Sequence, residues 1–137
     1  MKRGPEDEAA SGTSSPARAG SADPTNEAHS MGMLAHLLGA VLGCVLGPLG
    51  LIGPLMIWLS MRTDDPFIDE QGKEAINFQL HLLIWHAGAF VLAVAGFALF
   101  SPHYVPRALS LVFGLLGARD ARRGTSYRYP FTTRVIR

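Results

Sequence analysis

Two long stretches without a charged residue limit most strongly what this chain can fold into. No Asp, Glu, Lys or Arg lies between Ser30 and Met61, and none lies between Ala75 and Pro106. Each stretch is longer than the roughly 20 apolar residues that cross a bilayer core as a helix. Only 17% of all residues are charged, against about a quarter in an average soluble domain. The sequence therefore predicts an all-α integral membrane protein.

The two stretches give approximate positions for the membrane helices. We expect crossings at about 34–60 and about 77–100, with a third, shorter crossing at about 104–118. Within the first, the Gly-Pro pairs at Gly47 and Gly53 favour breaks, because proline lacks a backbone donor.

Asp65 followed by Pro66 is typical of a helix start, since aspartate caps the first turn and proline fits its first position. The second helix is therefore expected to begin outside the membrane, at about Phe67, and to continue to Phe100.

The segment 1–30 differs from the rest in composition. It holds no aromatic residue and no Leu, Ile or Val, so it cannot bury enough apolar surface to become ordered. We expect a disordered tail over 1–30 and a membrane domain over 31–137.

Charge gives two alternatives for the topology. With three crossings, the loop 62–76 and the C-terminus share a side rich in Lys and Arg, which the positive-inside rule places in the cytoplasm of a multi-pass cell-membrane protein. The N-terminus then lies on the opposite side. With two crossings, both termini are cytoplasmic and the loop faces outward.

A polar face at the start of the second helix is the best candidate for a functional surface. On a helix that turns about 100° per residue, Glu70, Glu74, Asn77 and His81 share one side. Neutral polar groups at membrane depth are costly unless they find partners. The candidate residues are Asp69, Glu70, Gln71, Lys73, Glu74, Asn77, Gln79 and His81.

Catalysis and metal binding are disfavoured for this face. Helical di-metal proteins use a Glu-x-x-His spacing, whereas Glu74 and His81 are seven positions apart. No Ser, Cys or Lys nucleophile is placed to work with His81. We expect no catalytic residue, metal or cofactor, and the structural alternative is hydrogen bonding between helices.

Two further features indicate packing and interfacial contacts. Gly39, Gly43 and Gly47 recur every four residues, which leaves a smooth face against another helix in this chain or in a second copy. The C-terminal segment 124–137 alternates aromatic or apolar residues with arginines, so we expect an extended interfacial anchor or a docking surface for the acidic loop. Its motif residues are Tyr127, Arg128, Tyr129 and Pro130.

The stretch "GPLMIWLSMRTDDPFIDEQGKEAINFQL" and the ending "YRYPFTTRVIR" resemble a family of small bacterial membrane proteins of undetermined activity. That family is similar to the twenty-kilodalton channel subunit of the chloroplast inner-envelope protein-import translocon. The resemblance covers 31–137. It implies a multi-pass helical protein and carries over no catalytic residue or cofactor.

These observations favour a non-enzymatic membrane subunit in the lipid bilayer, packing with itself or with other membrane proteins. The alternative is a pore or carrier in which Asn77, His81 and His86 line a polar path. The net charge of +1, without a basic stripe outside the C-terminal tail, gives no reason to expect nucleic acid.

Overall fold

The structure, a computed structural model, describes residues 23–97 and 103–137, and these residues form an all-helical protein, as predicted. The elements are α1 (Pro24–Leu46), the 3-10 turn η1 (Gly47–Leu51), α2 (Ile52–Met61), α3 (Pro66–Leu92), the π-type turn η2 (Ala93–Phe97) and α4 (Tyr104–Arg122). The C-terminal segment, residues 123–137, follows α4 without helix or strand.

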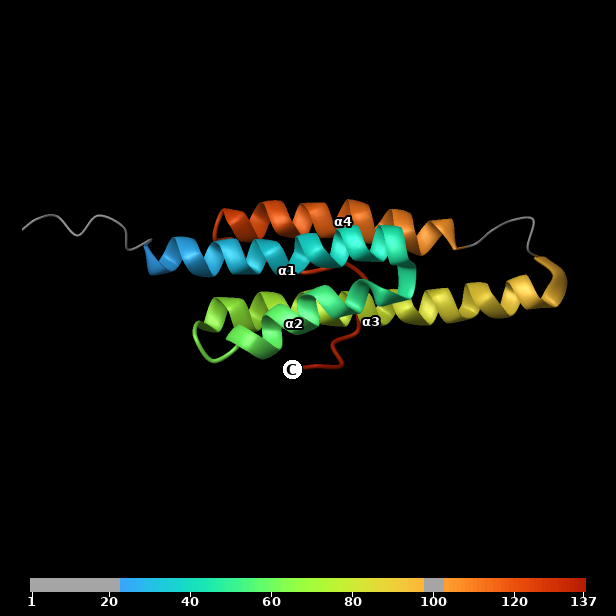
Figure 1. Cartoon of the computed structure of the whole chain (residues 1–137), viewed down its shortest axis with the longest axis horizontal. Helices are drawn as coiled ribbons and strands as arrows, with labels where there is room; N and C mark the ends of the chain where they lie inside the picture. Colours follow the sequence, from blue (N-terminus) through green and yellow to red (C-terminus); the bar gives the residue numbers. More distant parts are fainter. Residues whose placement is uncertain (1–22, 98–102) are drawn as a thin grey trace, which may run out of the picture.

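The chain reverses direction at η1. Gly47 has a φ of 61°, a backbone conformation that glycine adopts at low cost. Beyond the turn, Gly50 packs on Gly43 and Gly53 packs on Leu38, so α2 runs back along α1 (Figure 1). The predicted break is present, but 34–60 is not one straight helix: it is an antiparallel hairpin.

Helix α1 begins earlier than the composition of the tail indicated. Asp23 caps it by accepting a hydrogen bond from the backbone N–H of Thr25, and Pro24 takes the first position. The prediction of a disordered tail is therefore wrong for residues 24–30, which form the first turns of α1. Residues 1–22 lie outside the described residues.

Helix α3 begins as the sequence predicted. The carboxylate of Asp65 accepts a hydrogen bond of 2.7 Å from the backbone N–H of Phe67, and Pro66 is the first helical residue. The helix ends at Leu92, and Gly96 has a φ of 95° in the turn η2. The expected continuation over 98–100 lies outside the described residues.

Helix α4 lies along α1 with small residues at the contact (Figure 1). A Cβ on Gly114 would lie 2.5 Å from Cβ of Ala40, and one on Gly117 would lie 2.9 Å from Nδ1 of His36. The third predicted helix therefore exists and is longer than the apolar stretch 108–118.

The start of α1, the loop between α2 and α3, and the end of α4 lie at one end of the bundle (Figure 1). The ring of His29 packs on Phe67, with centroids 5.1 Å apart, and Arg122 donates a hydrogen bond to Ser30. The loop between α2 and α3 and the end of α4 thus share one end of the bundle, as the three-crossing alternative expects. The start of α1 shares this end too, because the chain reverses at η1.

Large apolar side chains cover the outside of the bundle. Two helical stretches, Pro24–Met61 and Pro66–Gly96, are long and apolar enough to cross a membrane. Exposed fractions of 64% for Val45, 70% for Ile84 and 74% for Val94 are typical of surfaces that face lipid instead of water. The bundle is therefore a membrane protein in contact with the bilayer.

Candidate functional site

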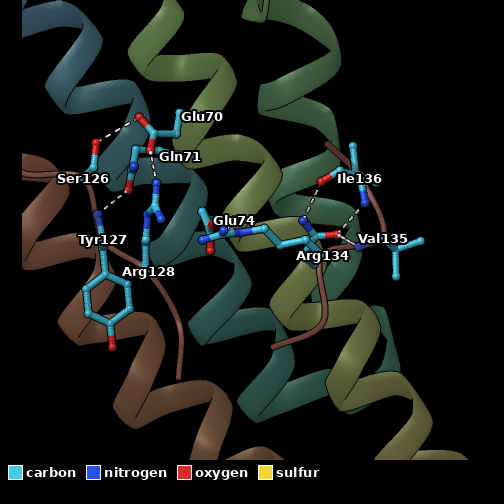
Figure 2. Close-up of polar contacts among 10 residues, drawn as sticks. Glu70, Gln71, Glu74, Ser126, Tyr127, Arg128, Arg134, Val135 and Ile136 are labelled. Carbon is cyan, nitrogen blue, oxygen red and sulfur yellow. Dashed lines mark hydrogen bonds and ion pairs between the residues drawn. The ribbon is translucent and has the colours of Figure 1, made fainter. Parts of the chain in front are cut away.

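The acidic face of α3 is covered by the C-terminal segment. Glu70 accepts a hydrogen bond of 3.0 Å from the hydroxyl of Ser126 and lies 3.9 Å from the guanidinium of Arg128. One turn further, Glu74 accepts a hydrogen bond of 2.8 Å from Nε of Arg134 (Figure 2). These contacts correspond to the second alternative given for the C-terminal segment, a docking surface for the acidic residues before and in α3.

Asn77 holds the end of the segment. Its Oδ1 accepts hydrogen bonds of 3.0 and 2.9 Å from the backbone N–H groups of Val135 and Ile136, and its Nδ2 donates one of 2.9 Å to the carbonyl of Ile136. The side chain is 1% exposed. An extended segment outside a sheet has no neighbouring strand to bind its backbone N–H and C=O groups. The side-chain amide of Asn77 binds these groups instead.

A buried network of three side chains connects α1, α3 and the C-terminal segment. His36 Nε2 lies 3.0 Å from Oε1 of Gln71, and His36 Nδ1 lies 2.7 Å from the hydroxyl of Tyr129. Because Oε1 only accepts, Nε2 carries the proton and Nδ1 accepts from Tyr129. The backbone N–H of Tyr127 donates a second hydrogen bond, of 3.1 Å, to the same oxygen of Gln71 (Figure 2).

The aromatic residues of the C-terminal motif face the bundle instead of the headgroups. Tyr129 is 7% exposed and stacks on Phe78, with centroids 3.9 Å apart and planes 8° apart. Burial raises the pKa of the Tyr129 phenol well above its ordinary value. The expectation of rings at headgroup depth is therefore wrong for Tyr129, whereas Arg128 and Pro130 are exposed.

Asp69 and Lys73 form a separate set of hydrogen bonds at the start of α3. Lys73 donates a hydrogen bond of 2.6 Å to Asp69, and Nε1 of Trp58 donates one of 2.8 Å to its other oxygen. Asp69 therefore connects α3 to α2, and Lys73 pairs with Asp69 along α3. Both residues also border a shallow depression beside the C-terminal segment.

The glycines of α1 pack inside this chain. Gln79 donates a hydrogen bond of 3.1 Å to the hydroxyl of Ser110, which in turn donates to the carbonyl of Gly39 at 3.1 Å. A Cβ on Gly43 would collide with Ser110. Gly39 and Gly43 thus admit polar side chains from α3 and α4, whereas Gly47 leaves the predicted row to form the turn η1.

His81 is separate from the clasp that Glu70, Glu74 and Asn77 form. Its Nε2 accepts a hydrogen bond of 3.2 Å from Nε1 of Trp85, and its side chain borders an apolar cavity beside Phe131. Of the four residues that the helical period places on one side, Glu70, Glu74 and Asn77 bind the C-terminal segment. His81 forms its hydrogen bond with Trp85 instead.

The polar residues of this face form hydrogen bonds and ion pairs within the protein, an arrangement that favours a structural role over catalysis. The side chains of Gln71, Glu74 and Asn77 are buried and bound to the chain itself. Within 23–97 and 103–137, no group of three His, Cys, Asp or Glu residues is placed to hold a metal ion. The site is thus organised to fix the C-terminal segment.

Sequence reasoning missed His36, Ser110 and the inward role of Tyr129. Each is a polar group on or near an apolar helix whose partner is far away in the chain. The glycines of α1 and α4 could have indicated these contacts, because glycine leaves room for a polar side chain from a neighbouring helix. They are Gly39, Gly43, Gly114 and Gly117. Small residues at a helix contact permit the close approach that polar partners need in a membrane.

Comparisons with known proteins give one match. Residues 27–136 match the magnetosome magnetite crystal formation protein family. No curated protein and no solved structure matches the chain. The match supports the predicted family of small bacterial membrane proteins but not the similarity to the chloroplast translocon subunit. Since it covers most of the sequence and all the residues of the clasp, the chain belongs to the magnetosome magnetite crystal formation protein family.

Proposed function

We propose that the chain is a non-enzymatic subunit of a magnetosome membrane that contributes to magnetite crystal formation by binding membrane proteins, including copies of itself. The binding surface is the polar end, defined as residues 66–77 of α3 with the C-terminal segment 123–137. The observation that supports this proposal is the clasp itself, in which Asn77 and Glu74 fix the segment over α3. A fixed surface binds with less loss of conformational entropy than a mobile tail.

The polar end keeps exposed charges of both signs. Arg128 is 67% exposed, Arg134 45% and Glu70 43%. Arg137 and Asp69 border the same shallow depression. Mixed charges at short range favour a protein partner of complementary pattern over a partner of a single sign such as nucleic acid.

We infer that the polar end faces the cytoplasm. Every Lys and Arg among the described residues, except Arg107, belongs to the polar end, to the loop between α2 and α3 or to the last turn of α4. The positive-inside rule places such an end in the cytoplasm. This orientation retains the expectation for the loop 62–76 and the C-terminus and adds the start of α1 to the same side.

The contacts support a binding role more than catalysis or transport. Asn77 and Glu74 are engaged by the C-terminal segment, and the family is not a known enzyme family. The pore alternative is not carried further, because Asn77, His81 and His86 each form a hydrogen bond within the chain.

Site-specific photocrosslinking in native membranes tests the binding surface. A photoreactive residue at position 128 should trap a defined partner or a second copy, because Arg128 is exposed on the polar end. The matched control is position 94, where Val94 is 74% exposed at the other end of the bundle. Trapping of the same proteins from both positions, or of none from position 128, would refute the proposed surface.

A second experiment connects the surface to crystals. In a magnetite-forming host that lacks the native chain, Arg128→Glu should fail to restore crystal size, measured by electron microscopy. Arg119→Glu makes the same charge change at a residue that is 61% exposed outside the polar end. Equal restoration by both variants would exclude a role for this surface in crystal formation.

A further inference from the structure

A cavity of about 560 Å³ lies at the other end of the bundle, away from the clasp. Its apolar wall includes Leu83 and Phe90 of α3. Its polar lining comes from the second half of α3 and the beginning of α4 and consists of His86, His103, Tyr104 and Arg107. A volume of this size is within the range of ligand sites, roughly 300 to 1,000 Å³.

The cavity exists because the α1–α2 hairpin ends before α3 does. Gly47, at the turn, faces His86: a Cβ on this glycine would lie 3.0 Å from Nε2 of the histidine. From His86, α3 continues to Leu92 and η2 follows, a further length of roughly 15 Å. Figure 1 shows α3 extending past the turn. The cavity, called the recess below, is lined there by residues of α3 and of the start of α4.

Two buried polar atoms at the recess have no hydrogen-bond partner among the described residues. His86 is 5% exposed, and its Nδ1 donates a hydrogen bond of 2.9 Å to the carbonyl of Leu82, which leaves Nε2 without a partner. Nε of Arg107 is also buried without a partner. Buried polar groups in proteins nearly always have a hydrogen-bond partner, so these two atoms point to a polar ligand at the recess.

Among residues 23–97 and 103–137, no acidic side chain forms an ion pair with Arg107. The sequence has no Asp or Glu between Glu74 and Asp120, and none between Glu27 and Asp64. Arg107 also lies in the first turn of α4, where the helix dipole is positive and no side chain caps the backbone N–H groups. A cation there is unfavourable unless an anion lies beside it.

We propose that this recess binds a phosphate group, held by Arg107 and the start of α4, with His86 as a further polar partner. Guanidinium is the side chain best matched to phosphate, because its fork donates two parallel hydrogen bonds. Since Nδ1 of His86 donates to the carbonyl of Leu82, Nε2 accepts a hydrogen bond from a hydroxyl of the ligand. A metal ion is disfavoured because Arg107 lies on the same wall.

The phosphate has two possible sources, a lipid headgroup or free inorganic phosphate. Exposed apolar residues border the recess, with Leu83 37% and Phe90 64% exposed. An acyl chain lying along these residues would add affinity that inorganic phosphate lacks. The experiment therefore includes both sources.

The test uses the full chain purified in detergent and native mass spectrometry with phosphatidylglycerol. The wild type should retain one phosphatidylglycerol, and Arg107→Gln should lower its affinity by roughly ten- to a hundredfold, as expected for hydrogen bonds to a charged group. Arg119→Gln is the matched control, with the same change at the opposite end. Competition by inorganic phosphate would identify the free anion, and resistance to it would identify the lipid.

A second measurement needs no variant and remains valid if Arg107→Gln does not fold. A photoreactive phosphatidylglycerol should label the wild-type protein within residues 83–107, and excess unlabelled phosphatidylglycerol or phosphate should prevent the labelling. Labelling restricted to other regions would overturn the proposal. Equal losses of affinity in Arg107→Gln and Arg119→Gln, or failure of the wild type to bind either phosphatidylglycerol or phosphate, would also overturn it.

Discussion

The hydroxyl of Tyr129 lies 2.7 Å from Nδ1 of His36, although 93 positions separate the two residues in the chain. This hydrogen bond joins the C-terminal segment to the centre of the first helix. Since Gln71 binds the other ring nitrogen, one histidine connects three elements. Tyr129 is therefore the residue through which the C-terminal segment enters the core of the bundle.

Tyr129→Phe removes the hydroxyl and leaves Nδ1 of His36 without a partner. Because His36 is 1% exposed, the loss should destabilise the folded protein by about 1–3 kcal/mol. Thermal unfolding in detergent, followed by circular dichroism, measures the change. Tyr104→Phe is the control, since Tyr104 is 69% exposed. Equal effects of the two variants would show that the bond to His36 does not contribute.

Asn77→Ala should release the end of the C-terminal segment while the helices stay folded. It removes three hydrogen bonds to Val135 and Ile136, each worth about 0.5–1.5 kcal/mol. Hydrogen exchange of these two backbone amides should accelerate by roughly ten- to a hundredfold. The exposed Asn26 provides the control variant Asn26→Ala. Unchanged exchange in Asn77→Ala would contradict the clasp.

Gly43→Ala should weaken the packing of α1 with α3 and α4. The added Cβ would collide with Ser110 and lie 3.2 Å from Oε1 of Gln79, and overpacking of this kind costs about 1–3 kcal/mol. Gly88→Ala adds the same methyl group to α3 where nothing lies within 4 Å, so it should be neutral or stabilising. Both thermal midpoints are compared in one detergent. A Gly43→Ala variant as stable as Gly88→Ala would contradict the close packing.

The stability of the protein should fall in alkali because of Tyr129. Burial raises the pKa of its phenol, and the nearby Tyr127 and Glu74 raise it further. A raised pKa in the folded state means that the stabilisation is complete below about pH 10, the pKa of the unfolded state, and is lost as the pH rises towards the folded value. Denaturation midpoints measured across this range should fall less steeply in Tyr129→Phe. Identical slopes would refute the assignment.

The start of α3 shows how far local sequence rules extend. The cap by Asp65, the position of Pro66 and the common face of Glu70, Glu74 and Asn77 all follow from neighbouring residues and the helical period, and the structure confirms them. What this face contacts did not follow. Helical period gives the direction of a side chain but not the identity of a partner about sixty positions away.

The hairpin shows the opposite limit. The pair Gly47-Pro48 predicts a break in the helix, but a break does not determine the angle between the two helices that it separates. The reversal depends on Gly50 meeting Gly43 and Gly53 meeting Leu38, contacts that exist only once the two helices are side by side.

The sequence by itself determined that this is an all-helical membrane protein, where α3 begins, and which polar residues share its face. These properties depend on composition, capping and periodicity, which act within a few residues. The tertiary structure alone decided that the chain reverses at η1, that Tyr129 reaches His36, and that Arg107 and His86 line one recess whose lining includes no acid. Such relationships arise from the packing of helices against one another, and short-range rules contain no information about the distances between them.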